Sequence, residues 1–190
     1  APYSLSKFQA EKGLLRLADG AFSPVILRKG TVHGFSPRMR YDLVLNTFVK
    51  DALSKGRLTL YNRGLVWRPV IDIRDVALAY IFLLEADEEK VRGQIFNLAL
   101  KNIQIKDLAA KTKEVFSELR LPLSIKLKTT RRQRTYQIST RKINNLGWKP
   151  IFSLETSIRD LIKKISEKEY SDFENPIYYN IIWVKQRLGW

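Results

Sequence analysis

Pro24-Val25-Ile26-Leu27-Arg28 is the stretch of sequence that decides how this chain folds. Its run of three apolar residues is typical of a parallel strand that is buried on both faces. Residues 3–18 precede the strand and read as a helix, and Asp19-Gly20 is expected to end it, because glycine commonly closes helices. The loop 29–40 follows the strand, and open α/β sheets bind their ligands at the carboxyl ends of their strands. We therefore expect this loop to border a ligand site.

Helices and strands alternate along the rest of the chain. The spacing of apolar residues predicts helices over 41–55, 74–86, 105–119, 139–146 and 154–168, and strands over 58–61, 70–73, 95–98 and 123–127. The helix over 3–18 is predicted to have an apolar side made of Leu5, Phe8, Leu14, Leu15 and Leu17. This alternation predicts an α/β fold with a largely parallel sheet. The aromatic-rich tail, residues 169–190, is predicted to dock onto the body of the protein or onto a partner.

Composition excludes several classes of site. The chain has 190 residues, 45% of them hydrophobic, which is enough for a core. It has no cysteine and a single histidine, His33, so disulfides and thiolate metal sites are excluded, and no metal site is expected. His33 is expected to be structural, and a Ser-His-Asp triad through it is the alternative. No apolar run is long enough to span a membrane and no signal peptide is visible, so we expect a cytoplasmic protein.

The net charge of +15 allows three interpretations. A strongly basic chain can bind nucleic acid, it can offer a cleft for an anionic small molecule, or it can simply carry a solvated basic edge. The charges are dispersed, and the one dense run lies within residues 126–142. An anionic small molecule such as a nucleoside diphosphate sugar is therefore favoured over nucleic acid.

Tyr3 and Lys7 are four residues apart at the start of the first predicted helix, so both side chains lie on one face. A positive charge beside a phenol favours the phenolate, and such a tyrosine can exchange a proton with an alcohol or a ketone. The spacing also occurs by chance, in which case Tyr3 is a packed side chain and Lys7 a solvated one.

The order of the motifs along the chain favours the acid/base interpretation of Tyr3 and Lys7 over a chance spacing. The chain carries Tyr3-Ser4-Leu5-Ser6-Lys7, then Gly30-Thr31-Val32-His33-Gly34, then Trp67-Arg68-Pro69-Val70-Ile71-Asp72, then Phe96-Asn97-Leu98, then Asn145-Leu146-Gly147-Trp148. From about Tyr3 to about Lys164 this series resembles the C-terminal half of the extended short-chain dehydrogenase/reductases, and more narrowly the NAD-dependent nucleotide-sugar epimerases and dehydratases. The glycine-rich dinucleotide turn of the family is absent. The chain is thus expected to be a fragment or one product of a split gene.

The resemblance implies specific roles. Tyr3 would be the acid/base, and Lys7 would hold the ribose of NAD or NADP and lower the pKa of Tyr3. The substrate, a nucleotide sugar, would be bound by Thr31, Asn46, Tyr61, Arg68 and Arg134. Arg68 would bind the diphosphate, since a guanidinium offers a bidentate fork to phosphate oxygens. Arg132 stands where the family often has an aspartate that accompanies the Arg134 position. For these binding residues a structural role, as an ion pair, a core aromatic or an exposed helical side chain, was the alternative.

The resemblance also suggests an organisation. The expected fold is the C-terminal part of a Rossmann-like parallel sheet with an interleaved small substrate-binding lobe. Residues 1–35 would be the remainder of the Rossmann domain, residues 36–168 the lobe with returning Rossmann elements, and residues 169–190 the tail. A sheet lacking its first strands would expose an edge that invites pairing, so a homodimer, or a hetero-assembly with a separate chain supplying the N-terminal half, is expected. The alternative functions are a non-catalytic protein-interaction module and, less favoured, a basic nucleic-acid binder.

Overall fold

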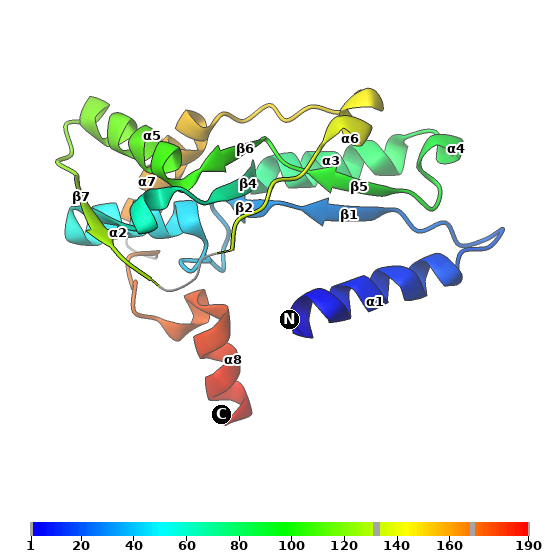
Figure 1. Ribbon diagram of the computed structural model, residues 1–190, viewed down its shortest axis with the longest axis horizontal. Coiled ribbons are helices and arrows are strands. Elements are labelled where there is room, and N and C mark those ends of the chain that lie inside the picture. The colour runs from blue at the N-terminus through cyan, green and yellow to red at the C-terminus, as the bar shows by residue number, and fades with distance from the viewer. Residues whose placement is uncertain (1, 131–133, 168–169, 190) are drawn as a thin grey trace.

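The computed structural model describes residues 2–130, 134–167 and 170–189, and helices lie on both sides of short, mostly parallel strands (Figure 1). The helices are α1 (Pro2–Arg16), α2 (Val44–Lys55), α3 (Ile73–Glu85), α4 (Glu88–Val91), α5 (Ile105–Glu118), α6 (Arg141–Asn145), α7 (Leu154–Ser166) and α8 (Asn180–Leu188), with short 3-10 turns η1 (Asn62–Gly64) and η3 (Pro176–Tyr178). The strands are β1 (Ile26–Lys29), β2 (Thr31–His33), β3 (Arg57–Tyr61), β4 (Trp67–Asp72), β5 (Ile95–Leu98), β6 (Lys101–Gln104) and β7 (Ser124–Lys128). The predicted α/β class with parallel strands is confirmed.

The strands pair in three groups. β1 pairs with β5, β2 with β4, and β3 with β7, each in parallel, while β6 runs antiparallel to β4. β1 and β2 are separated only by Gly30, where the extended chain passes from one partner to the next. A Cβ atom on Gly30 would lie 3.0 Å from the carbonyl oxygen of Pro69, so this crossing requires glycine.

Several elements differ from the sequence-based prediction, among them α8 in the tail, which was not predicted, and β4, which begins three residues before the predicted strand 70–73. The predicted loop 29–40 contains β2, because the β-branched Thr31 and Val32 pair with β4 despite the glycines around them. β6 was missed because its polar residues conceal a strand that is anchored by β4. α4 was also missed, and it is a single turn capped by the Asp87 side chain, which accepts a hydrogen bond from the Glu89 amide.

The buried apolar residues form two clusters. One gathers side chains of α2, β3, α5 and α7, including Leu45, Phe48, Leu58 and Ile158. The other gathers β5, α3 and α6, including Phe96, Val76 and Ile143, and the half-buried Leu27 of β1 packs against it. β1 therefore contributes to a core on one face only, which is unusual for a parallel strand.

A buried carboxylate connects the two halves of the fold. Asp72 caps α3 by accepting from the Arg74 amide at 2.9 Å, and it also accepts from the Arg74 guanidinium and from Ser157 of α7. Burial alone would raise the pKa of Asp72, but the hydrogen bonds from Arg74 and Ser157 outweigh it and hold the pKa below its usual value. Asp75 accepts from the amides of Ile151 and Phe152, and its pKa is raised, chiefly by burial.

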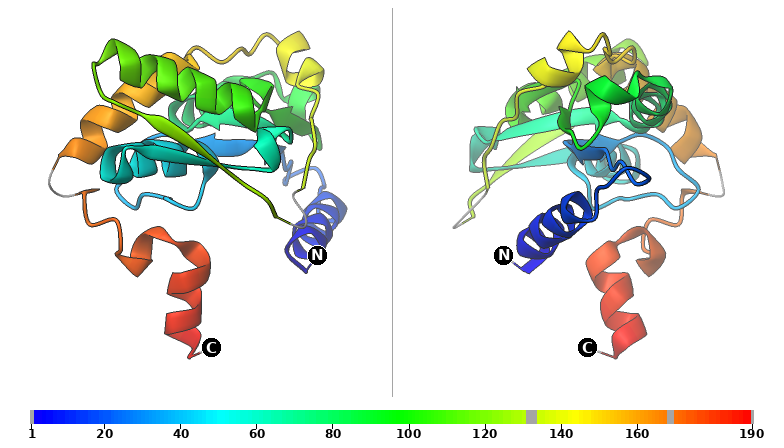
Figure 2. Two further views of the ribbon diagram at one scale, coloured as in Figure 1. Left: turned by 60° about the vertical axis from the view of Figure 1, so that its left-hand side comes forward. Right: turned by 90° about the vertical axis from the view of Figure 1, so that its right-hand side faces the viewer.

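The apolar side predicted for the first helix is not packed. α1 buries none of its residues, and Leu5, Phe8 and Leu17 are at least half exposed. Its contact with the body is the pair between Glu11 and Arg28, in which the Arg28 Nε donates to a Glu11 carboxylate oxygen at 3.0 Å. In Figures 1 and 2 the helix lies beneath β1, apart from the rest of the fold.

The tail docks partly on its own body. Tyr41 stands in a group of aromatic rings with Phe173, Tyr178 and Tyr179, and its hydroxyl donates to the Tyr170 carbonyl oxygen at 2.6 Å. α8 then extends away from the body with no buried residue (Figure 2). Trp190 lies outside the described residues.

His33 is buried at the end of β2, with 1% of its surface exposed. Neither ring nitrogen has a hydrogen-bond partner among the described residues. Burial lowers its pKa from 6.5 to about 4, and the nearby Asp72 carboxylate offsets only part of this effect. A structural role for His33, as expected, accords with this environment.

The low pKa of His33 predicts acid lability. Because the folded-state pKa lies below the unfolded value, the unfolded chain binds the proton first, and stability falls as the pH drops from about 6.5 toward 4. Between pH 7 and pH 5 the free energy of unfolding should fall by about 2 kcal/mol more for the native chain than for His33→Phe. Urea unfolding at the two pH values measures this difference, and equal losses in both proteins would contradict it.

Candidate functional site

Tyr3 and Lys7 lie together on the first two turns of α1. The Lys7 ammonium is 5.8 Å from the centre of the Tyr3 ring, as the spacing of four residues predicts. The Ser6 hydroxyl donates to the Tyr3 carbonyl oxygen at 2.8 Å, which is a bond within the helix and engages neither side chain of the pair. Tyr3 is 71% exposed, so the pair is accessible to a second molecule, and α1 holds it away from the body.

Arg68 is positioned by the strand β4 and by the segment that contains Arg134. Its Nη1 donates to the carbonyl oxygens of Trp67 and Arg134, and its guanidinium lies 5.5 Å from the centre of the Tyr136 ring. Among the described residues no protein acceptor bonds to the Nε or Nη2 of Arg68. The edge of the guanidinium that suits bidentate binding of a phosphate is therefore still available.

The structure thus brings Arg68 and Arg134 together. The segment 134–136 is held along the start of β4, where the Trp67 amide donates to the Thr135 hydroxyl at 3.0 Å and the Tyr136 amide donates to the Trp67 carbonyl oxygen. Arg134 is exposed, and its carbonyl oxygen accepts from Arg68, so the two residues are neighbours on the surface. Arg132 lies outside the described residues.

Two asparagines that sequence reasoning missed hold this segment at both ends. The Asn62 side chain accepts from the Thr130 amide at 2.9 Å and donates to the Thr130 carbonyl oxygen at 3.0 Å. Asn102 does the same with Ile138, at 3.0 Å and 2.9 Å. Asn97 adds a bond to the Ser139 carbonyl oxygen. The only sequence signal was an asparagine at a strand end or in a turn, which is too common to indicate a clamp.

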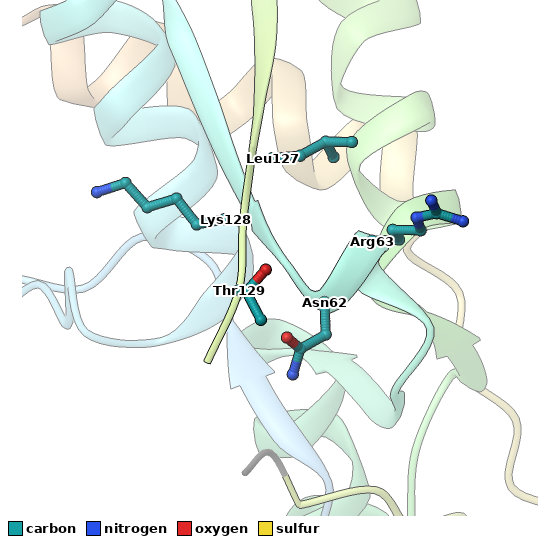
Figure 3. Close-up of a pocket in the computed structure, with 5 residues that line it drawn as sticks. All are labelled: Asn62, Arg63, Leu127, Lys128 and Thr129. Atoms are coloured by element: carbon teal, nitrogen blue, oxygen red, sulfur yellow. The ribbon is translucent and has the colours of Figure 1, made fainter. Parts of the chain in front are cut away.

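A pocket of about 390 Å³ lies where β3 and β7 end, lined by Asn62, Arg63, Leu127, Lys128 and Thr129 (Figure 3). Figure 3 shows Asn62 and Thr129 facing one another across the pocket, whereas Lys128 and Arg63 point outward on opposite sides. The charged side chains of Lys128 and Arg63 therefore lie on either side of a pocket whose centre is lined by the uncharged Asn62 and Thr129. Tyr61 is paired with Lys128 across the strands and is 42% exposed.

Thr31 and Asn46 lie elsewhere. Thr31 begins β2 opposite Val70 and is half-buried. Asn46 is buried in α2, where its side chain accepts from the Gly34 amide and donates to the Arg40 carbonyl oxygen, both at 3.1 Å. Both polar groups of the Asn46 side chain thereby hold the loop that follows β2 in its conformation.

Apart from Thr31 and Asn46, the predicted site residues form two groups. Arg68, Arg134 and Tyr61 belong to the β3–β4–β7 side. Tyr61 and Arg68 lie on β3 and β4 themselves. Arg134 follows Thr130, just after β7, by four residues, which span at most about 14 Å. Tyr3 and Lys7 belong to α1. Among the described residues no three acidic, histidine or cysteine side chains are grouped as a metal site would need. Within the same residues, no helix combines the length and the apolar character that crossing a membrane requires.

Comparison with known proteins shows the family. Residues 1–99, just over half of the chain, match the NAD dependent epimerase/dehydratase family, and the chain belongs to this family. Cinnamoyl-CoA reductase 1 from Arabidopsis thaliana is 31% identical over 98 residues, which cover 52% of this chain and 27% of that protein.

Two solved structures share the fold. The UDP-glucose 4-epimerase of Thermotoga maritima, solved with UDP-glucose, is 21% identical with a TM-score of 0.74 over 87% of this chain and 53% of that one. The dTDP-glucose 4,6-dehydratase of Bacillus anthracis, solved with NAD, is 19% identical with a TM-score of 0.71 over 96% of this chain and 55% of that one. The chain thus spans about half the length of these structures, and a smaller share of the plant reductase.

The Asn102 clamp predicts a local effect of mutation. Asn102→Ala removes both bonds to Ile138, so amide exchange at Ile138 should accelerate by roughly tenfold or more, because one such bond contributes about 1 kcal/mol. Exchange measured by NMR tests this. Asn145→Ala, at an exposed position of α6, is the control. Unchanged protection of Ile138 in Asn102→Ala would show that the clamp does not hold the segment.

Proposed function

We propose that this chain is the C-terminal, substrate-binding and acid/base-bearing part of an NAD- or NADP-dependent nucleotide-sugar epimerase or dehydratase. The observation that carries the proposal is the position of Arg68 against Arg134 and Tyr136 at one end of β4. Membership of the NAD dependent epimerase/dehydratase family supports it. The UDP-glucose and NAD held by the two structural neighbours indicate the substrate and cofactor classes.

The acid/base work falls to Tyr3. Its phenolate would take the proton from a sugar hydroxyl as the hydride leaves the same carbon, and it would return the proton when the ketone is reduced. The Lys7 ammonium, 5.8 Å from the centre of the Tyr3 ring, lies where it could contact the ribose of the cofactor. A nicotinamide cofactor, when bound, would accept and return the hydride.

This chain supplies residues for only part of a cofactor site. Tyr3 and Lys7 are exposed on one helix face and can contact a nicotinamide ribose. The glycine-rich turn that would bind the pyrophosphate is not among the 190 residues. The cofactor site therefore requires residues from outside this sequence.

The substrate would lie across the β3–β4–β7 side. Arg68 and Arg134 would bind the diphosphate, since guanidinium groups pair with phosphate oxygens through charge-assisted hydrogen bonds. Tyr61 offers a ring on which a base can stack, beside the pocket at Asn62 and Thr129. Asn46, which holds the loop after β2, and Thr31 would shape the sugar end.

Loss of Arg68 should weaken nucleotide binding. Arg68→Ala removes charge-assisted bonds that contribute about 1.5–3 kcal/mol, so the affinity for UDP should fall roughly 10- to 100-fold. Isothermal titration with UDP measures this. Arg141→Ala removes the same charge from an exposed position on α6 and is the control. An equal loss in Arg141→Ala would show that net charge, rather than the Arg68 geometry, governs binding.

The chain alone should bind NAD weakly. Because the pyrophosphate-binding turn is missing, we expect no micromolar affinity for NAD and no turnover of UDP-glucose by the 190-residue protein. Isothermal titration and an assay for epimer or keto sugar test the two statements. Micromolar binding of NAD to the isolated chain would contradict the assignment of the cofactor site to two pieces.

A further inference from the structure

We propose that the side of the β3–β7 pair that points away from the core binds single-stranded RNA, as a function separate from the turnover of a nucleotide sugar. We call this surface the β3–β7 face, and it consists of Arg57, Thr59 and Tyr61 of β3 and Ser124, Lys126 and Lys128 of β7. The inference does not rest on the proposed function, because only Tyr61 of this set is among the residues assigned to the nucleotide sugar.

Two stretches of the sequence carry positive charge and no negative charge. Residues 52–71 and 119–136 together hold ten Lys and Arg residues and no Asp or Glu, so they account for ten charges of the net +15. The two stretches are far apart in the sequence, but β3 belongs to the first and β7 to the second, and these strands pair in parallel over their whole length. The fold therefore brings side by side the positive charges that the sequence disperses.

The side chains of this strand pair alternate between the core and the β3–β7 face. Leu58 and Leu60 are buried in the core with residues of α2, α5 and α7. Because successive side chains of a strand point to opposite faces, the other three residues of β3 point away from the core. The register places Tyr61 beside Lys128 on that side, and Lys126, one alternation back along β7, follows on the same face. Both lysines are exposed, and β7 lies at the left-hand rim of the fold in Figure 1.

The spacing of charge and ring on this face suits an extended polynucleotide. Two residues along a strand span about 6.6 Å, so Lys126 and Lys128 can bind successive phosphates. Neither lysine forms an ion pair with a described residue, so both ammonium groups are available. Tyr61 is 42% exposed beside Lys128, so a base can stack on its ring while the ammonium binds a neighbouring phosphate. Cations along a track with an aromatic ring beside them are how proteins bind single-stranded nucleic acid.

The track continues beyond the end of β7. The Asn62 side chain holds Thr130, and the segment 134–136 lies along the start of β4. There the Arg68 guanidinium lies 5.5 Å from the centre of the Tyr136 ring, which is 46% exposed, and Arg134 adds a second cation. Residues 130 and 134 are at most about 14 Å apart. A second exposed ring with cations beside it is therefore within reach of the same RNA strand.

Three features of this face select single-stranded RNA among polyanions. In a duplex the bases are stacked inside, so they could not reach the Tyr61 ring. Ile125 and Leu127, the large apolar residues of β7, belong to the opposite face, so this face offers no aliphatic side chain to insert into a lipid surface. Thr59 lies on the face as well, and its hydroxyl bonds to no other described residue. It is therefore available to the 2′-hydroxyl by which proteins distinguish RNA from DNA.

The binding experiment uses the 190-residue chain and a fluorescent oligouridine of about 12 nucleotides, a length within the site sizes of such stacking surfaces. Fluorescence anisotropy at low salt should show binding. The affinity should fall with salt, with a slope of about −2 to −3 in log K against log salt, as three or four phosphate contacts predict. The duplex with oligoadenosine, and a DNA strand of the same bases, should each bind at least fivefold more weakly.

Matched variants test the face itself. Lys126→Gln removes one phosphate contact, so it should weaken binding about fivefold at about 0.1 M salt and make the salt slope shallower by about 0.7. Lys113→Gln removes the same charge from an exposed position of α5 and should change the affinity less than twofold. Tyr61→Leu should weaken binding at least fivefold, whereas Tyr61→Phe keeps the ring and should stay within twofold. An unchanged circular dichroism spectrum confirms that each variant is folded.

Each outcome decides the proposal. Absence of binding at low salt, or equal losses in Lys126→Gln and Lys113→Gln, would overturn it. Equal affinity for the duplex or the DNA strand would also overturn it, as would competition by polyglutamate as effective as that by unlabelled oligouridine. Failure of the proposed function is distinguishable, because Lys126→Gln should leave the affinity for UDP within twofold. A chain that binds oligouridine as described but does not bind UDP would contradict the nucleotide-sugar site and leave the RNA-binding face intact.

Discussion

The rest of the structure depends on a parallel strand, β1, that is hydrogen-bonded on one side only. Its pairing with β5 fixes the core around Leu27 and Phe96. Its continuation through Gly30 and β2 leads the chain to α2 and the other core, around Leu45 and Phe48. On its other side no described strand pairs with β1, and the helix before it buries none of its residues. α1 is therefore attached chiefly by an exposed ion pair, and such pairs contribute about 1 kcal/mol or less.

The two groups of proposed site residues therefore differ in how firmly the fold holds them. Arg68 and Arg134 are set by backbone bonds and by the asparagine clamps at Asn62 and Asn102, so the binding side is preformed. Tyr3 and Lys7 face each other correctly, yet their helix has no packed face to hold it against that side. Reaction geometry would require α1 to be held in one position, because misplacement of a catalytic group by about 1 Å can lower the rate 100-fold.

Much of the fold follows from local sequence patterns. Val25 to Leu27, the apolar spacing of α2, α5 and α7, and the turn at Asn62 to Gly64 predicted their elements closely. β2 and β6 escaped prediction because their strand character comes from pairing with β4, and pairing partners far apart in sequence leave no local pattern.

The candidate site was predictable to a similar extent. The spacing of Tyr3 and Lys7 predicted their contact. The resemblance to the family implied that Arg68 and Arg134 both bind phosphate, and the structure places the two residues next to each other. The roles of Asn62 and Asn102 depend on where Thr130 and Ile138 fall in space, which only the fold determines. The exposure of α1 was not predictable, because an apolar strip predicts burial and none of the described residues buries this one.

The position of α1 is the most direct test of this account. The chain has no cysteine, so Gln9→Cys on α1 and Lys113→Cys on α5 provide unique sites for spin labels. The distance distribution between them, measured by pulsed electron resonance, should be broad in the 190-residue chain, because α1 has no buried residue to hold it against the body. A single narrow distance would contradict the account.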